Sequence, residues 1–103
     1  MTSSVTLLEA EKLEKVAFIL KTIAHPLRIG IIDLLTNHEK LSVNEICRQL
    51  DAEQSLVSHH LSNLRLKGIL KSTREGKNIF YELHLRDVIK VIQCMHECKI
   101  KLP

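Results

Sequence analysis

The stretch Asp51-Ala-Glu-Gln-Ser-Leu-Val-Ser-His-His-Leu-Ser-Asn-Leu-Arg-Leu-Lys-Gly68 decides the fold, and its pattern predicts a helix. Asp51 suits the helix start because its carboxylate can accept a backbone N–H, with Gln54 three residues on, and Gly68 suits the end. Apolar residues at helical spacing predict an inner face. That face consists of Leu56, Val57, Leu61, Leu64 and Leu66.

The opposite surface of this helix carries short hydrogen-bonding side chains followed by cations, with no carboxylate between Gln54 and Lys67. Its members are Gln54, Ser55, Ser58, His59, Ser62, Asn63, Arg65 and Lys67. Amides, hydroxyls and imidazoles can contact base edges in a DNA major groove, while cations contact phosphates. The pattern therefore favours a DNA-reading helix, with an ordinary solvated helix face as the alternative.

The composition of the chain predicts one globular domain over residues 1–103. The 103 residues are 45% hydrophobic, enough for a modest core. Aromatic residues make up only 3%, which argues against a stacking platform for single-stranded nucleic acid. The net charge is +3. Between Arg65 and Lys77 there are five cations and a single carboxylate, Glu75. These cations are Arg65, Lys67, Lys71, Arg74 and Lys77. A nucleic-acid face on the second half of the chain is expected.

Several classes of protein are disfavoured by what the sequence lacks. No charged-then-apolar leader opens the chain and no apolar run reaches membrane-spanning length, so we expect a cytoplasmic protein with no membrane partner. The three cysteines are then expected to be reduced thiols. No Ser/His/Asp set, catalytic carboxylate pair or glycine-rich phosphate loop is recognisable. The sequence therefore predicts neither an enzyme nor a bound cofactor.

Residues 5–24 predict a long amphipathic helix, with Thr6 and Glu9 as a capping box. Its apolar stripe consists of Leu13, Val16, Ala17, Leu20, Ile23 and Ala24, and is widened by Phe18 and Ile19. A helix this broadly apolar needs cover on two sides. We favour a partner subunit on the second side. The alternative is burial within a single domain, for which 103 residues offer little material.

The next segment predicts a helix-turn-helix. Pro26 ends the first helix, because the residue before a proline is pushed out of the helical region, and it suits the first position of a helix to about Asn37. Ser42 with Glu45 forms a second capping box, which starts a short helix over residues 43–50. A tight turn then leads into the helix quoted above. Two helices in this relation, the second polar on its outside, are typical of a helix-turn-helix.

After Gly68 the pattern changes to strands. Residues 69–73 and 78–83 flank Arg74–Lys77, whose glycine suits a hairpin turn. Residues 85–100 predict a last helix, which pairs with the first helix at a subunit interface. Its apolar positions are Val88, Val91, Ile92 and Met95. The predicted fold class is mainly α with a small β-hairpin (α+β), in the order helix-helix-helix-helix-hairpin-helix, which is a winged helix-turn-helix.

Three stretches carry a family resemblance. They are Leu20-Lys-Thr-Ile-Ala-His-Pro-Leu-Arg-Ile-Gly-Ile-Ile-Asp-Leu-Leu35, Ser55-Leu-Val-Ser-His-His-Leu-Ser-Asn-Leu-Arg65 and Arg74-Glu-Gly-Lys-Asn-Ile-Phe-Tyr-Glu-Leu83. In this order and spacing they resemble the ArsR/SmtB-type bacterial transcriptional repressors, over nearly the whole chain and most clearly over residues 20–83.

The resemblance implies a homodimer that binds an imperfect palindrome in double-stranded operator DNA and represses transcription. The helix from about Glu53 would enter the major groove, and the Arg74–Lys77 wing would touch the flanking backbone or minor groove. In many members of the family a metal ion or an oxidant weakens DNA binding.

The family's two metal sites are not supported by the matching residues. Where the third helix of the family begins with a pair of cysteines, this chain has Ser42 and Asn44. Where the last helix carries oxygen and nitrogen ligands, it has Leu85, Asp87, Cys98 and Lys101, so an aliphatic residue and a lysine replace two donors. The sequence therefore predicts no metal site of either type and reveals no inducer.

Cys94 and Cys98 are the remaining candidates for a sensor. Cysteines at i and i+4 on one helix face can share a metal or react with an oxidant. A disulfide within one intact helical turn is strained, so a bond across the dimer is the favoured oxidised form. The alternative is that both are small apolar residues packed at the dimer interface. Cys47, on the third helix, has no cysteine within two residues.

Two functions from different classes fit the pattern. The first is a dimeric DNA-binding repressor, which takes its affinity from phosphates and its specificity from the 54–63 surface. The second is a winged-helix module that binds another protein and no DNA. The fold alone does not separate them. The cations between Arg65 and Lys77, together with the carboxylate-free helix face, favour the repressor.

Overall fold

The structure is a computed structural model that describes residues 9–99. Its elements are α1 (Ala10–Ile23), α2 (Pro26–Asn37), β1 (Leu41–Ser42), α3 (Val43–Leu50), α4 (Gln54–Leu66), β2 (Leu70–Glu75), β3 (Asn78–Leu83) and α5 (Val88–Glu97). The predicted order of helices and hairpin is confirmed. The short strand β1 is an addition, and it makes the hairpin part of a three-stranded antiparallel sheet with the order β1-β3-β2.

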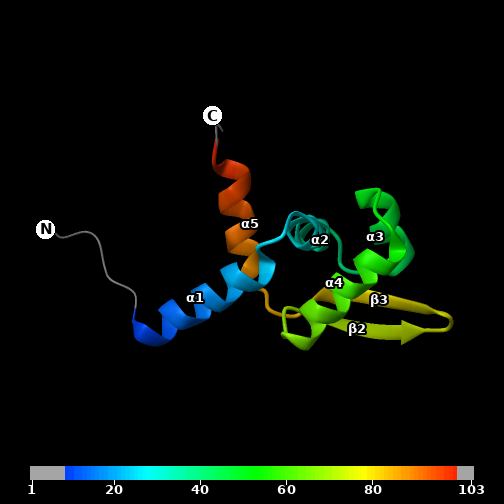
Figure 1. Cartoon of the computed structure of the whole chain (residues 1–103), viewed down its shortest axis with the longest axis horizontal. Helices are drawn as coiled ribbons and strands as arrows, with labels where there is room; N and C mark the ends of the chain where they lie inside the picture. The colour runs from blue at the N-terminus through cyan, green and yellow to red at the C-terminus, as the bar shows by residue number, and fades with distance from the viewer. Residues whose placement is uncertain (1–8, 100–103) are drawn as a thin grey trace, which may run out of the picture.

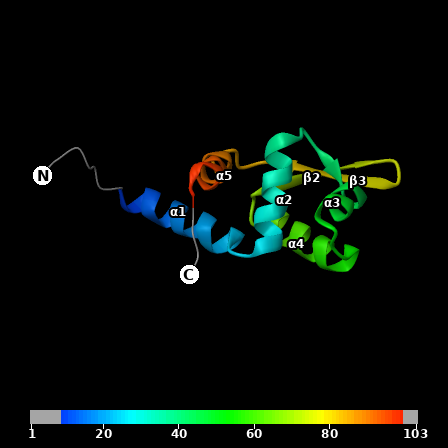
Figure 2. The same ribbon diagram turned by 90° about the horizontal axis from the view of Figure 1, so that it is seen from above.

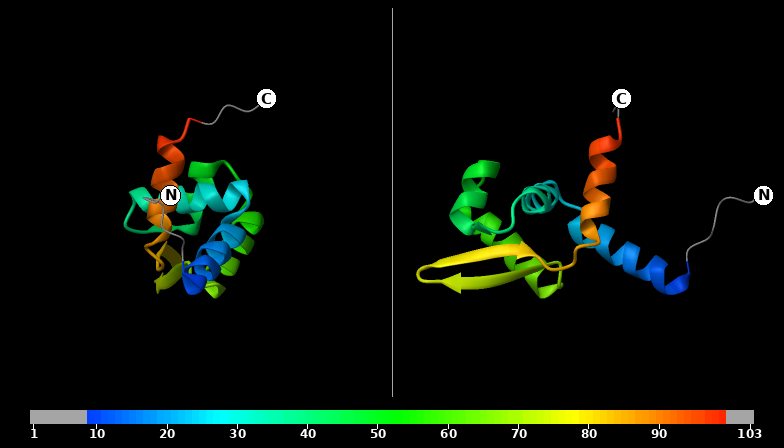
Figure 3. Two further views of the ribbon diagram at one scale, coloured as in Figure 1. Left: turned by 90° about the vertical axis from the view of Figure 1, so that its left-hand side faces the viewer. Right: turned by 180° about the vertical axis from the view of Figure 1, so that it is seen from behind.

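The helices α2, α3 and α4 form a compact group, and two elements project from it in opposite directions. The β2–β3 hairpin, which we call the wing, extends from one end, and α1 extends from the other (Figure 1). The same arrangement is seen from above in Figure 2. Seen from behind, α5 stands upright beside the end of α1 that joins α2 (Figure 3). No helix among the described residues is both long and apolar enough to cross a membrane.

Local signals predicted α2 and α3 correctly. His25 is the N-cap of α2 in an extended conformation, its Nδ1 accepts the backbone N–H of Leu27 at 3.1 Å, and Pro26 takes the first helical position. In α3 the capping box is complete, because the Ser42 hydroxyl accepts the Glu45 N–H at 3.2 Å and the Glu45 carboxylate accepts the Ser42 N–H at 2.9 Å. Donation from the Ser42 backbone N–H lowers the pKa of the Glu45 carboxyl, and the Ser42 hydroxyl lowers it further.

The predicted start of the groove helix at Asp51 is wrong. Asp51 has a φ of 49° and ends α3 in the left-handed conformation, which aspartate tolerates better than most residues. The helix α4 begins three residues later, at Gln54, and its N-cap Glu53 makes no side-chain capping bond. Asp51 therefore ends α3 through its backbone conformation, and its carboxylate does not cap α4.

The predicted first helix also begins later than expected. Among the described residues it covers Ala10–Ile23, and its N-cap Glu9 makes no side-chain capping bond. Residues 5–8 of the predicted helix lie outside the described residues. Thr6, the other half of the predicted box, lies outside the described residues. The last helix is likewise shorter, Val88–Glu97 instead of 85–100.

The wing is a tight hairpin. Its first strand runs two residues further than predicted, so that Glu75 pairs with Asn78 and only Gly76 and Lys77 form the turn. Gly76 has a φ of +63°, a conformation that costs a glycine nothing. At the other edge of β3, Leu41 pairs with Tyr81 and Ser42 with Phe80. This pairing fixes the wing to the start of α3.

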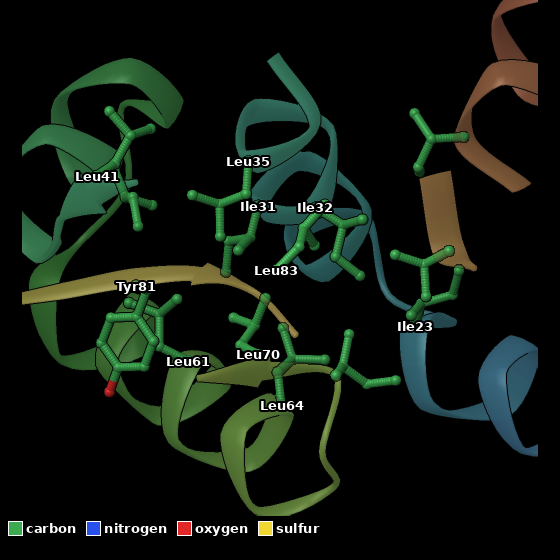
Figure 4. Close-up of a cluster of buried hydrophobic side chains, with 14 of the residues drawn as sticks. Ile23, Ile31, Ile32, Leu35, Leu41, Leu61, Leu64, Leu70, Tyr81 and Leu83 are labelled. Atoms are coloured by element: carbon green, nitrogen blue, oxygen red, sulfur yellow. The ribbon is translucent and has the colours of Figure 1, made fainter. Parts of the chain in front are cut away.

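The core lies between α2, α3, α4, α5 and the sheet, and α1 adds only its C-terminal end (Figure 4). Ile31 and Ile32 of α2 and Leu61 and Leu64 of α4 are fully buried. Burying a side chain of this kind contributes about 1.5–3 kcal/mol, so these residues hold α4 firmly against α2. From α1, Ile23 reaches the same cluster.

The inner face of α4 differs from the predicted one at both flanks. Leu56 and Leu66 are 47% and 75% exposed, whereas His60 is buried. The buried positions are Val57, His60, Leu61 and Leu64, which follow the helical period of i, i+3, i+4 and i+7. Leu56 and Leu66 fall outside that arc. The predicted stripe followed hydrophobicity alone and therefore missed a histidine that completes the period.

Candidate nucleic-acid interface

The exposed surface of α4 displays most of the predicted contact residues together. Gln54, Ser55, His59, Ser62 and Arg65 are exposed, and Ser58 is half-buried at the edge of the same surface. The Ser55 hydroxyl donates a 2.6 Å hydrogen bond to the Glu53 carboxylate, so this serine is partly engaged. The other side chains make no hydrogen bond to the described residues and keep their capacity for an external partner.

A groove joins this surface to the wing. It has a volume of about 200 Å³ and lies between the first turn of α3, the first two turns of α4 and the wing tip. We call it the wing groove, and its lining residues are Ser42, Val43, Asn44, Gln54, Ser58, Lys77, Asn78 and Ile79. Three residues predicted from different segments, Gln54, Ser58 and Lys77, thus meet at one place. Polar side chains that meet in this way can donate to the phosphate oxygens of a duplex.

The sequence reasoning missed two polar members of the wing groove. Asn44 is exposed in the first turn of α3, and Asn78 is exposed directly after the hairpin turn. Both are short amides able to donate to a phosphate oxygen. The capping box at Ser42 marked the start of α3 and could have drawn attention to Asn44. The position of Asn78 against α3 depends on the tertiary pairing of β3 with β1.

The wing carries cations, and only some of them are neutralised. Lys71 pairs with Glu82 across the hairpin at 3.3 Å. The Glu75 carboxylate, which would repel DNA, is paired with Lys40 from the loop before β1, and this pairing raises the pKa of Lys40. Arg74 and Lys77 form no ion pair with the described residues and are exposed. Two unneutralised cations therefore remain at the tip of the wing.

Asn63 lies apart from the other predicted contact residues. It is half-buried, and its Oδ1 is shielded from solvent without a hydrogen-bond partner among the described residues. It lines a separate pocket on the other flank of α4, with residues of α1 and α2. The structure thus brings Gln54, Ser58 and Lys77 together at the wing groove and puts Asn63, with Lys67, at a separate pocket.

A polar cluster centred on the buried His60 lies behind the exposed surface of α4. The Arg28 guanidinium donates from Nε to His60 Nδ1 at 3.0 Å, and from a terminal nitrogen to the Thr22 carbonyl at 2.9 Å. The rings of His25 and His59 lie 4.4 Å and 5.4 Å from the His60 ring, centroid to centroid. Arg28 therefore connects the end of α1 to α4, whose outer side is the exposed surface described above, through the buried imidazole of His60.

The chemistry of this cluster requires a neutral His60. Its Nδ1 accepts from Arg28, so the proton of the neutral ring is on Nε2, which is buried without a partner among the described residues. Desolvation lowers the pKa of His60, and the neighbouring His25, Arg28 and His59 lower it further. Every charged or chargeable neighbour is a cation, so nothing nearby stabilises the imidazolium.

Comparison with known proteins places this site in a family. Residues 25–72 match the family model described as "Bacterial regulatory protein, arsR family". The transcriptional repressor PagR of Bacillus anthracis is 38% identical over 89 residues, covering 86% of this chain and 89% of PagR. The chain belongs to the arsR family. It is accordingly a DNA-binding transcriptional regulator, and the resemblance found in the sequence is confirmed.

Solved structures of this family share the fold. The crystal structure of PagR superimposes with a TM-score of 0.74 at 39% identity, covering 84% of this chain and 99% of that one. HlyU from Vibrio cholerae N16961 superimposes with a TM-score of 0.78 at 30% identity, covering 86% and 96%. The homodimeric winged helix-turn-helix domain of Mb0332 from Mycobacterium bovis matches in fold, with a TM-score of 0.69 at 24% identity over 93% and 88%.

Two residues at the positions of the arsR family's metal sites take part in other interactions here, and one of them is Ser42 of the α3 capping box. Asp87, the one retained oxygen ligand of the last-helix pattern, accepts a 2.8 Å hydrogen bond from Lys15 of α1, which lowers its pKa. Lys101 lies outside the described residues. Among residues 9–99 no three His, Cys, Asp or Glu side chains are grouped so that they could hold a metal ion.

The cysteine pair of this arsR-family chain lies at the end of α5. Cys94 and Cys98 are both exposed, and the Cys98 N–H donates to the Cys94 carbonyl at 3.0 Å. Cys98 is the C-cap and has an extended backbone, so it stands at the edge of the helix and not within an intact turn. Cys47 is half-buried against the core, as expected for a packing residue.

Proposed function

We propose that this arsR-family protein is a homodimer that represses transcription by binding a specific operator in double-stranded DNA. The observation that carries the proposal is the wing groove with its continuation over α4. There, hydrogen-bonding side chains and unneutralised cations from α3, α4 and the wing form one surface without an unpaired carboxylate apart from Glu53 at its edge. The alternative of a protein-binding module without DNA is disfavoured by the family.

The proposal gives each part of the surface a role. Gln54, Ser55, Ser58 and His59 lie on the first two turns of α4, the part that reaches base edges in helix-turn-helix proteins. Ser62 and Arg65 extend this surface toward the end of α4. Arg74 and Lys77 contact phosphates from the wing tip, with Asn44 and Asn78 as neutral donors beside them. Asn63, whose oxygen is buried, takes no part in this proposal.

The dimer is proposed from the exposed apolar surface of the terminal helices. Leu13, Val16 and Leu20 of α1 are 52%, 37% and 50% exposed and share one helical stripe. On α5, Met95 is exposed beside the two cysteines. The expected interface residue Ile92 is instead 2% exposed and belongs to the subunit's own core, as does Val88. We therefore assign the interface to the exposed apolar residues of α1 and α5 named above. The proposal treats residues 1–103 as a single domain.

Repression is the proposed direction of regulation because PagR, named a transcriptional repressor, is similar along most of its length. HlyU of Vibrio cholerae, which is named a transcriptional activator, is less similar to this chain than PagR is. It is 34% identical over 82 residues, covering 80% of this chain and 75% of HlyU. Because its DNA target lies in the cytoplasm of a prokaryotic cell, the proposed working compartment is the cytoplasm. The proposal assigns the protein no catalytic activity.

The test is selection of bound sites from a random DNA pool, followed by gel shifts of the selected site and a scrambled site at two salt concentrations. A palindromic site bound by a dimer, with half-sites about one helical turn apart, is the expected result. Specific binding should exceed random binding by roughly 10³-fold or more. A reporter driven from a promoter that contains the selected site should lose expression when the protein is present. Enrichment of no sequence would contradict the proposal.

A further inference from the structure

A second pocket lies on the flank of α4 that faces away from the wing groove. It is a surface pocket between α1, α2 and α4, with a volume of about 320 Å³. We call it the inner pocket, and its lining residues are Phe18, Lys21, Thr22, Arg28, Asn63 and Lys67. Asn63 of the inner pocket and Ser58 of the wing groove are five residues apart on α4, which is about 140° around the helix. The two pockets are therefore separate sites.

Three of the six residues that line the inner pocket are cations, and none is a carboxylate. Lys21 comes from α1, Arg28 from α2 and Lys67 from the C-cap of α4. The ion pairs of the described residues involve other lysines, so these three charges are not neutralised within residues 9–99. Three like charges converging from three elements repel one another unless an anion lies between them.

Arg28 is already oriented for such an anion. Its hydrogen bonds to His60 Nδ1 and to the Thr22 carbonyl use two of the five guanidinium N–H groups. The other three have no acceptor among the described residues. A planar guanidinium with an unused edge matches a carboxylate or phosphate in two-point contact. Because its position is fixed beforehand, little side-chain entropy is lost when an anion binds.

The neutral groups of the inner pocket complement a free hydrogen phosphate in particular, because a carboxylate and a DNA phosphodiester carry no hydroxyl. The buried Asn63 Oδ1 lacks a donor within the described chain, and leaving such an acceptor unsatisfied is costly. A hydrogen phosphate group has one O–H that could donate to it. Phe18, 43% exposed, gives the pocket one apolar wall.

We propose that the inner pocket is a binding site for an oxyanion group, a phosphate or a carboxylate, held by Arg28 with Lys21 and Lys67 beside it. Phe18 lies about 160° around α1 from Leu20. The pocket therefore stays open when the Leu13–Leu20 stripe is covered by a second subunit. The group has two conceivable sources, a free anionic metabolite or a phosphate of bound DNA at the flank of α4, and the experiment separates them.

The first arm uses the full chain without DNA. Sodium phosphate, and separately sodium acetate, is titrated against sodium chloride at equal ionic strength, while Tm and the amide NMR signals of Thr22 and Asn63 are recorded. At tenfold excess over Kd, Tm should rise by about 6 °C. Lys21→Gln combined with Lys67→Gln should abolish the rise. Lys12→Gln combined with Lys90→Gln removes the same charge at exposed positions elsewhere on the helices and should keep it.

The second arm measures operator affinity against salt in phosphate-free buffer. If the group is a DNA phosphate, the pocket double variant should lose about one unit of salt-dependence slope relative to the matched control, because one phosphate contact is lost. If it is a free anion, the slope is unchanged and only the first arm responds. The proposal is overturned when the pocket variant equals the control in both arms. The first arm contains no DNA, so its failure is distinguishable from failure of the proposed operator binding.

Discussion

The helices α1 and α4 are both amphipathic, and they differ in what they leave exposed. The outer surface of α4 carries hydroxyls, an imidazole and a guanidinium, while its inner surface is buried along four positions. The outer surface of α1 carries Leu13, Val16 and Leu20, and only Ile19, Thr22 and Ile23 at its C-terminal end are buried. One helix is anchored along its length, and the other extends away from the body (Figure 1).

This difference indicates which kind of partner each helix contacts. Apolar surface gains roughly 25 cal/mol for each Å² removed from water, so the leucine stripe of α1 is stabilised by protein against protein. Hydroxyl and amide groups gain little from burial unless each finds a partner, and base edges and phosphates provide those partners. The exposed chemistry of α1 therefore fits a second subunit, and that of α4 fits DNA.

The largest expected effect comes from charging the stripe of α1. Leu20→Asp should convert the dimer to monomer, because an acid cannot be buried unpaired at an apolar interface. A monomer engages one half-site, so operator affinity should fall by 10²-fold or more as the linked second contact is lost. Sedimentation gives the oligomeric state and gel shift the affinity.

The control for that change is Phe18→Asp, an apolar-to-acidic substitution on the same helix but on a different face. It should leave the dimer intact. An unchanged dimer in Leu20→Asp would move the interface to another surface and remove the contrast between α1 and α4.

The next effect concerns the base-reading part of α4. Ser58→Ala or His59→Ala should each cost roughly 1–3 kcal/mol on the preferred operator and much less on random DNA, because a lost base contact affects only the correct sequence. Ser72→Ala, at an exposed position on β2, should change neither affinity. Equal losses on both DNAs would reassign Ser58 and His59 to backbone contact.

A third effect tests the cluster behind α4. The pKa of His60 is lowered in the fold. Above the ordinary value of 6.5 the ring is neutral in both states, but below it the unfolded chain takes up a proton that the folded chain resists. The free energy of unfolding should therefore decrease as the pH falls below 6.5, by at most about 1.4 kcal/mol per pH unit for this one group.

The matched variant is His60→Asn, whose Oδ1 can accept from Arg28 in place of Nδ1 but does not titrate. Denaturant unfolding of both proteins at pH 7.5, 6.5 and 5.5 isolates the contribution of His60 from the other histidines. Stability curves with the same pH slope would show that His60 is free to become protonated in the fold.

A smaller effect is expected at the wing. Arg74→Ala or Lys77→Ala should weaken binding to all sequences similarly and reduce the salt-dependence slope by about one unit each, because each removes one phosphate contact. Lys71→Ala, whose charge is already paired with Glu82, is the control and should change the slope less. A change in the preferred sequence would mean that the wing reads bases.

The smallest effect is expected at the cysteines. Replacing Cys94 and Cys98 by Ser should leave operator binding nearly unchanged, and wild-type affinity should stay constant through zinc, copper, peroxide and polysulfide titrations, because we expect these residues to pack at the dimer interface. A ligand-dependent loss of affinity that the double variant abolishes would instead identify a sensor, with a coupling of about 1–3 kcal/mol. Cys47→Ser should behave as wild type in either case.

Local sequence determined the order of the helices and strands and most of the exposed polar surface of α4. Pro26 and the Ser42–Glu45 box set helix starts through interactions only a few residues long, so they were readable without the fold. The turn at Gly76 likewise follows from one glycine with positive φ. The exposed residues of α4 were predicted because helical periodicity separates two faces, and the polar face matched a chemistry that DNA recognises.

Tertiary structure alone decided the features that depend on distant residues. The Arg28–His60 hydrogen bond and the pairing of Leu41 with Tyr81 each join residues more than 30 positions apart in the sequence. Neither can therefore be predicted from a local sequence pattern. The burial of His60, the exposure of Leu56 and the separation of Asn63 from the DNA-facing surface follow from where α2 and α1 pack against α4. Periodicity reveals that a helix has two faces, but a residue at the boundary is buried or exposed only by its neighbours in space.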